Sequence, residues 1–200
     1  MDTYLNRGNA VLCTLLACLT LAALGNHFST YLISSAPTGD VSVADVYEFK
    51  HNQALQSDQA HLGLNIKADL SSCFNWNTKQ LFLYVVAKYE TPKNKRNEVI
   101  LWDRIATQPR EAVLELLNEM NKYPLRDHGR SLRNRNVTLH LEYVYHPIVG
   151  VMRTNTVAST TFTLPPSYVS FKETRGMGNL KGALPSYDIN DSGVDVAAAA

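Results

Sequence analysis

The chain has 200 residues, 45% of them hydrophobic, with a formal net charge of +1 and three cysteines. This length suits one domain of ordinary size with appendages, and the apolar fraction is too high for a disordered chain. The near-neutral charge argues against broad nucleic-acid binding, which needs a concentrated basic surface. The positions of Cys13, Cys18 and Cys73 allow neither a disulfide framework nor a zinc site.

The first element is an apolar segment without charge, which runs from Ala10 to Ile33 and is rich in leucine and alanine. At about 1.5 Å per residue it would form a helix of about 36 Å, enough to cross a bilayer core of about 30 Å. Asn26 and His27 are unfavourable in hydrocarbon, so we expect them near the headgroups at one end. A buried core helix fits this composition poorly, since the segment has no amphipathic period.

Two interpretations of this segment remain open. In the first, residues 10–33 are a retained transmembrane signal anchor, residues 1–9 are cytosolic, and Arg7 supplies the positive charge expected on the cytosolic side. In the second, the segment is a signal peptide that is cleaved near Gly25. We favour the anchor, and both interpretations place the rest of the chain on the lumenal or extracellular side.

After a short linker from Ser34, strands are expected. Val41 and Val43 begin a weak strand, and the next alternates apolar and polar residues from Leu62 to Leu70. Leu81–Tyr89 is apolar on both faces, so it should lie in the middle of a layered β structure and be covered on both sides. A charged turn with a proline follows, and Val99–Trp102 then returns as its hairpin partner.

A soluble helix is expected at Pro109–Tyr123. Proline suits a first helical position, and apolar residues recur at helical spacing through Met120. Residues 124–135 should form a polar loop, before two further strands, Val137–His146 and Thr156–Leu164.

The pattern as a whole predicts a mainly β protein, in which one N-terminal transmembrane helix is followed by a lumenal β-sandwich with one helix. The sandwich should occupy residues 34–172. Residues 173–200 lack a periodic apolar pattern and are expected to be a poorly ordered tail.

One modification site is predicted. Asn136-Val137-Thr138 is an N-glycosylation acceptor at a loop-to-strand boundary, downstream of a credible translocation signal, so we expect Asn136 to carry a glycan. Asn190 begins a second such tripeptide, but it lies in the tail and has less structural support.

No catalytic, cofactor-binding or metal-binding residues are predicted. The best local cluster is Ser131 with Asp127 and His128, in an arginine-rich polar loop, and the chain has neither a nucleophile elbow nor a zinc-binding His-Glu-x-x-His motif. Cys73 has no evident base partner in the sequence, and we interpret it as a small buried residue.

Three stretches carry a resemblance to a known family. They are FNWNTKQLFLYVVAKYET from Phe74, NEVILWDRI from Asn97 and NVTLHLEY from Asn136. In this order, after a short N-terminal anchor, they closely resemble the signal peptidase complex subunit 3 family. The resemblance covers roughly residues 1–172, is loose over residues 107–135, and does not extend to the tail.

The resemblance implies a single-pass type II protein of the endoplasmic reticulum membrane with a lumenal sandwich. It also implies a non-catalytic subunit that supports the serine-type catalytic subunit as the complex removes signal peptides from translocated proteins. The partners would be that subunit, other small membrane subunits and the lipid bilayer, without cofactor, nucleic acid or small-molecule substrate. Trp76 and Trp102 should then pack internally, and residues 107–135 should offer partner contacts.

Two other functions remain as alternatives. The main one is a secreted or lumenal β-sandwich binding module with a cleaved signal peptide, which predicts a soluble product. The other is an independent hydrolase, which predicts activity from the isolated lumenal domain.

Overall fold

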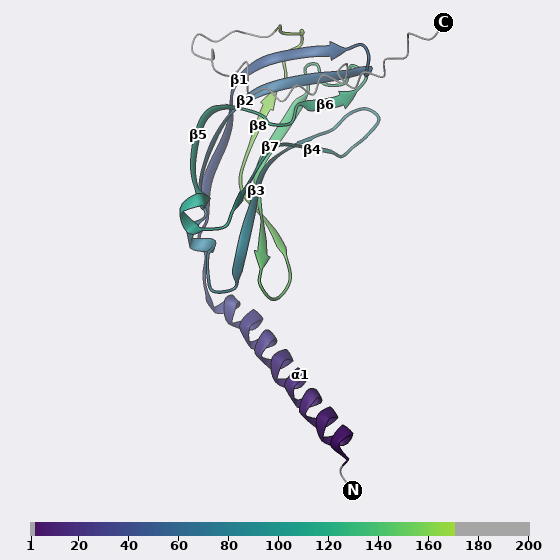
Figure 1. Ribbon diagram of the computed structural model, residues 1–200. Coiled ribbons are helices and arrows are strands. Elements are labelled where there is room, and N and C mark those ends of the chain that lie inside the picture. The colour runs from purple at the N-terminus through teal and green to yellow at the C-terminus, as the bar shows by residue number, and fades with distance from the viewer. Residues whose placement is uncertain (1–2, 171–200) are drawn as a thin grey trace, which may run out of the picture. The chain divides into compact units, whose positions relative to one another are not determined.

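The computed structural model describes residues 3–170, so the predicted tail and Asn190 lie outside the described residues. Within them the chain forms one long helix, three short 3-10 helices and eight strands (Figure 1). In chain order the elements are α1 (Tyr4–Ser29), η1 (Thr30–Leu32), β1 (Thr38–Asn52), β2 (Ser57–Asp69), η2 (Ser71–Cys73), β3 (Thr78–Tyr89), β4 (Asn97–Ala106), η3 (Pro109–Ala112), β5 (Val113–Met120), β6 (Leu125–His128), β7 (Asn136–Pro147) and β8 (Arg153–Thr163).

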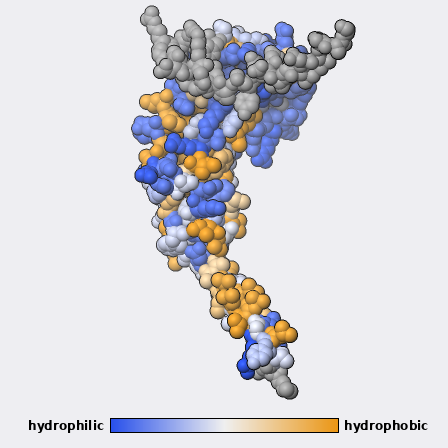
Figure 2. All heavy atoms as spheres, viewed as in Figure 1, coloured by the Kyte–Doolittle hydropathy of each residue, from blue (hydrophilic) through white to orange (hydrophobic). Residues whose placement is uncertain are grey.

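The helix α1 buries none of its side chains. Together with η1 it forms a segment, Tyr4–Leu32, that is long and apolar enough to cross a membrane. The hydroxyls of Thr14 and Thr20 donate to backbone carbonyls four residues earlier, which satisfies these polar groups inside the helix. Figure 2 shows hydrophobic side chains along α1 and hydrophilic ones towards its N-terminal end.

The eight strands form two antiparallel sheets of four strands each, and the predicted mainly β fold is confirmed. One sheet has the order β4-β3-β7-β8. In the other, β2 pairs with β1 along one edge and with both β5 and β6 along the other edge. The predicted hairpin is present as β3 and β4, with Tyr89 opposite Asn97 at its closed end.

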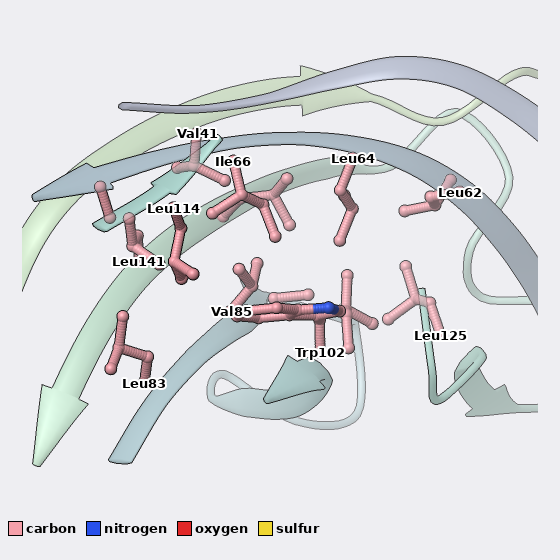
Figure 3. Close-up of a cluster of buried hydrophobic side chains, with 14 of the residues drawn as sticks. Val41, Leu62, Leu64, Ile66, Leu83, Val85, Trp102, Leu114, Leu125 and Leu141 are labelled. Atoms are coloured by element: carbon pink, nitrogen blue, oxygen red, sulfur yellow. The ribbon is translucent and has the colours of Figure 1, made fainter. Parts of the chain in front are cut away.

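The core lies between the two sheets. Leu62, Leu64 and Ile66 point into it from β2, and Leu83, Val85 and Leu141 point into it from β3 and β7 (Figure 3). The indole of Trp102 lies among them and is 3% exposed. The central position of β3 is as predicted, but its outer face is only half-covered. Phe82 and Tyr84 on that face are half-buried and stack on each other, with ring centroids 5.5 Å apart.

The prediction of a soluble helix at Pro109–Tyr123 is wrong. The start signal is real, because Glu111 and Gln108 form a capping box, but the helix ends after the single turn η3 and the chain continues as β5. The edge of β2 needs a partner for its backbone groups, and this tertiary demand overrides a local helix preference. Leu114 is therefore buried, whereas Leu117 is left 77% exposed.

The prediction of a polar loop at residues 124–135 is also partly wrong, since this segment contains the strand β6. Leu125 is fully buried and pairs with Ala60, and Asp127 pairs with Asp58. A strand of four residues is too short for an alternating pattern to stand out from a polar loop.

Candidate functional site at the joint between α1 and the sandwich

Two segments of the sandwich meet the C-terminal end of α1. One is the loop before β3, with Trp76 and Asn77, and the other is the β7–β8 turn, residues 148–152. They lie together because β3 begins where β7 ends, with Thr78 opposite Pro147. We call these two segments, together with residues 26–31, the joint.

The centre of the joint is Asn77, whose side chain is almost fully buried. Its Oδ1 accepts hydrogen bonds from Asn26 Nδ2 at 3.1 Å and from the backbone N–H of Val149 at 2.9 Å. Its Nδ2 donates to the Val149 carbonyl at 2.8 Å, and the N–H of Ile148 donates to the Asn77 carbonyl at 2.7 Å. One amide thus connects α1 to the β7–β8 turn, and it gives the polar side chain of Asn26 a hydrogen-bond partner.

A close approach at Gly150 strengthens this connection. Its φ is +120°, and a Cβ at this position would overlap the imidazole ring of His27. Both the backbone conformation and the lack of space therefore require glycine here. Nearby, Trp76 Nε1 donates to Ser29 Oγ at 3.2 Å, and the Arg153 guanidinium lies 4.4 Å from the centre of the Tyr31 ring.

The structure separates the two tryptophans that the sequence suggests would both pack internally. Trp102 is in the core as expected, but Trp76 is 62% exposed and the expectation for it is wrong. Its hydrogen bond to Ser29 fixes the indole against the last turn of α1 rather than inside the sandwich.

A cavity of about 290 Å³ lies between the end of α1 and the sandwich. Hydrogen-bonding side chains line much of it. Among the lining residues in the described part of the chain, Arg153 is the one with a permanently charged side chain. Tyr143 also lines it, next to Cys73, whose thiol lies 3.7 Å from the tyrosine hydroxyl. Burial, and then this contact, raise the pKa of Tyr143 above its ordinary value. Cys73 is buried, as predicted.

The predicted glycosylation residue lies at the other end of the sandwich. Asn136 is the first residue of β7 and is exposed, and its Oδ1 accepts a hydrogen bond from Thr163 at 2.7 Å. The strand between Asn136 and Pro147 spans roughly 36 Å at about 3.3 Å per residue. The amide is thus on the surface and remote from the joint, and its modification stays a prediction.

The Ser131 cluster does not assemble as a nucleophile with a base. Ser131 donates to Asp127, and its further contact is with the backbone carbonyl of His128, not with the imidazole. One histidine does lie beside a carboxylate, since His51 Nδ1 and Asp58 Oδ1 are 3.0 Å apart. Within residues 3–170, no hydroxyl or thiol hydrogen-bonds to His51, and no three metal-binding side chains come together.

Sequence reasoning missed two of these arrangements. Asp58 is fully buried and also accepts a hydrogen bond from the Tyr168 hydroxyl at 2.9 Å, which fastens the end of the described chain to β2. Its partners are too far apart in sequence for any spacing to reveal them. For the joint there was one signal, because Asn26 is a polar residue at the end of an apolar segment and therefore needs a partner.

The sequence is similar to a known protein family over most of its length. A family model described as a signal peptidase subunit matches residues 1–167, which include α1 and all eight strands. Signal peptidase complex subunit 3 of Caenorhabditis elegans is 36% identical over 181 residues, covering 88% of this chain and 99% of the relative. The proteins of the same name from Drosophila melanogaster and Dictyostelium discoideum are 35% and 30% identical, over 85% and 84% of this chain and 98% of each relative.

Proposed function

Because the chain belongs to the signal peptidase subunit family, we propose that it is a non-catalytic subunit of the signal peptidase complex in the endoplasmic reticulum membrane. In this role it supports the serine-type catalytic subunit while the complex removes signal peptides from translocated proteins. The observation that carries the proposal is the extent of the similarity, which runs from the membrane helix to the last strand and covers nearly the full length of the relatives.

The topology is part of this proposal. α1 is a retained signal anchor, with its N terminus in the cytosol and the sandwich in the lumen, as a single-pass type II protein. Two observations support retention. The possible cleavage position at Gly25 lies inside α1, whereas proteases act on extended backbone, and the helix end is bonded to the sandwich through Asn26 and Ser29.

The physical basis of the supporting role is positioning. The hydrogen bonds of the joint hold the sandwich against its own membrane helix, so a partner bound to the sandwich would be held at a set height above the bilayer. Orientation of this kind contributes strongly to catalysis when the scissile bond must meet the active site at one place.

Residues 107–135 contribute the contact with the catalytic subunit. In this segment Val113 and Leu117 are 53% and 77% exposed on the edge strand β5. Apolar side chains gathered on strand edges are a common feature of protein interfaces.

Affinity purification from microsomes in mild detergent, with mass spectrometry of the bound proteins, tests the assembly. We expect recovery of a serine-type signal peptidase with other small membrane subunits, and of a peptide that maps to residues 1–7. Recovery of a soluble, N-terminally trimmed form alone would favour the secreted binding module instead.

The same purification tests the contact surface. The double variant Val113→Asp, Leu117→Asp should lose the catalytic subunit because buried carboxylates are costly at an interface. Ser159→Asp, an exposed position on the opposite edge strand β8, is the matched control and should retain it. Full recovery of the complex with the double variant would contradict the assignment, and circular dichroism should show that both variants are folded.

A glycan at Asn136 would report the lumenal side directly. Treatment with an N-glycosidase should increase the gel mobility of the wild-type chain, and Asn136→Gln should abolish the shift. Asn190→Gln is the control for the second tripeptide. An unchanged mobility of the treated wild-type chain would contradict the lumenal assignment.

A further inference from the structure

We propose that the end of the sandwich at the joint is itself a lipid-binding surface, which lies among the phospholipid headgroups beside the membrane span. We call it the lipid-facing end and define it as Trp76, Ile148, Val151, Met152 and Arg153. The proposal rests on α1 spanning a bilayer, which is part of the proposed function. It adds a second place, apart from the helix, at which the chain binds the membrane.

The first argument is the exposure of large apolar side chains at this end. Trp76, Ile148, Val151 and Met152 are 62%, 63%, 66% and 61% exposed. Single exposed apolar residues are ordinary on a protein surface, but four at one end of a sandwich form a patch that needs an occupant. Figure 2 shows hydrophobic residues on α1 and again on the part of the sandwich next to it.

The second argument is the depth at which the patch is held. The indole N–H of Trp76 is bonded to Ser29, the last residue of α1, and Gly150 lies against His27, two residues earlier. Both contacts fix the loop and the turn beside the C-terminal end of the span. That end is where hydrocarbon gives way to headgroups, and tryptophan and tyrosine are enriched at this depth in membrane proteins.

The third argument is chemical and favours lipid over protein as the occupant. Phe28 and Tyr31 are 62% and 55% exposed, and they flank Ser29, the residue to which Trp76 is hydrogen-bonded. Arg153 lies over the Tyr31 ring and forms no ion pair with a carboxylate among the described residues. An arginine with available donors, beside aromatic and apolar side chains, matches the phosphate and the upper acyl region of a phospholipid.

The cavity beside Arg153 fits the same occupant. Tyrosine hydroxyls, asparagine side chains and His27 line it, and no carboxylate does within residues 3–170. A phosphate group carries negative charge and accepts hydrogen bonds, so a site with donors and without acidic residues favours it. The apolar tips of the β7–β8 turn would meanwhile contact the acyl chains next to the headgroup.

The two tryptophans make the proposal directly testable. The chain has two of them, and Trp102 is buried in the core whereas Trp76 is exposed at the joint. The full-length chain is placed in nanodiscs whose lipids carry bromine atoms at a shallow or a deep acyl position. The difference between wild type and Trp76→Phe then isolates the emission of Trp76. We expect shallow bromines to quench this emission strongly and deep bromines to quench it weakly.

A surface variant and a matched control sharpen the result. Val151→Asp with Met152→Asp should reduce the quenching of Trp76, because carboxylates are repelled from the headgroup–acyl boundary. Asn94→Asp with Lys95→Asp, in the exposed turn at the opposite end of the same sheet, should leave it unchanged. Equal quenching in both variants would overturn the assignment of the turn.

Two further outcomes distinguish this inference from the proposed function. If alkaline carbonate extracts the chain from membranes, the span itself is wrong. If the chain stays integrated but brominated lipids leave the emission of Trp76 unchanged, the lipid-facing end alone is wrong. The measurement is repeated on the purified complex in the same lipids. Loss of quenching there would show that a protein partner covers this end, which also overturns the proposal.

Discussion

Two hairpin turns at opposite ends of one sheet differ in almost every property that matters here. The β3–β4 turn, residues 90–96, carries Lys93, Lys95 and Arg96, and these side chains are exposed. The β7–β8 turn, residues 148–152, is uncharged and apolar, and is connected to α1 by hydrogen bonds through Asn77. Because β3 and β7 are adjacent and antiparallel, the two turns lie at opposite ends of the sandwich.

The difference teaches how the chain encodes an orientation. The strands between the turns obey the same rule, with alternate side chains in one core, so they do not distinguish one end from the other. The turns do, since ammonium and guanidinium groups stay in water whereas apolar side chains leave it. In the proposed orientation, the charged turn and Asn136 lie far from the bilayer and the apolar turn lies against it.

The largest expected effect on stability comes from a substitution in the core between the two sheets. Trp102→Ala removes a large side chain that is 3% exposed, and should lower the free energy of unfolding by about 3–5 kcal/mol. Trp76→Ala, at the joint, should lower it by less than about 1 kcal/mol because most of this side chain is already exposed. Denaturant titration of the full chain in nanodiscs, followed by far-UV circular dichroism, measures both, and similar losses would contradict the contrast between core and joint.

An intermediate effect on stability is expected from substituting two glycines with positive φ, one at each end of the sandwich. Gly150→Ala at the joint should cost about 1–3 kcal/mol, because φ is +120° and the new Cβ would overlap His27. Gly129→Ala, after β6 at the other end, has a φ of +75° and no atom within 4 Å of the new Cβ, so it should cost about 1 kcal/mol or less. The same denaturant titration compares them. A larger loss for Gly129→Ala would mean that contact with α1 does not constrain the β7–β8 turn.

The smallest expected effect on stability comes from the carboxylate of Glu142, which lies between the two ends of the sandwich. Glu142 on β7 accepts hydrogen bonds from Lys88 and from the Tyr84 hydroxyl, each at 2.7 Å. Burial alone would raise the pKa of Glu142, but these partners outweigh it and the pKa lies below its usual value. The resulting stabilisation is complete above the unfolded-state pKa of about 4.3 and is lost as the pH falls through the lowered folded-state pKa.

The measurement for Glu142 is the unfolding free energy as a function of pH. Glu142→Gln should flatten the decline below about pH 4.3 while leaving the other carboxylates to act as before. The change should be modest, since the Lys88 side chain is 33% exposed and water screens the pair. An unchanged pH profile in the variant would show that another acidic group causes the acid sensitivity.

Local patterns were sufficient wherever one residue period dominated a long segment. The apolar run before Ile33, the alternation from Leu62 to Leu70 and the two-faced strand at Leu81–Tyr89 each match an element of the structure. They could be predicted because burial and backbone hydrogen bonding demand the same periodicity at every residue in such a segment. The extent of β1, which runs to Asn52, was not visible, since its polar residues interrupt the pattern.

The candidate site was much less accessible to such reasoning. Asn26 could be recognised as a polar residue in need of a partner, but its partner Asn77 is 51 residues away. Trp76 resembled a core residue by its type, and its exposure follows only from where the loop before β3 meets the helix.

What the sequence by itself determined is the class of the protein: a helix long and apolar enough to cross a membrane, a β-rich body and a motif content that matches one family over residues 1–167. What only the tertiary structure decided is the state of residues 113–120 and the assembly of the joint. Both depend on contacts between segments far apart in the chain. The free edge of β2 turns a helix-like sequence into β5, and the contact of α1 with the loop before β3 and with the β7–β8 turn distinguishes one end of the sandwich from the other.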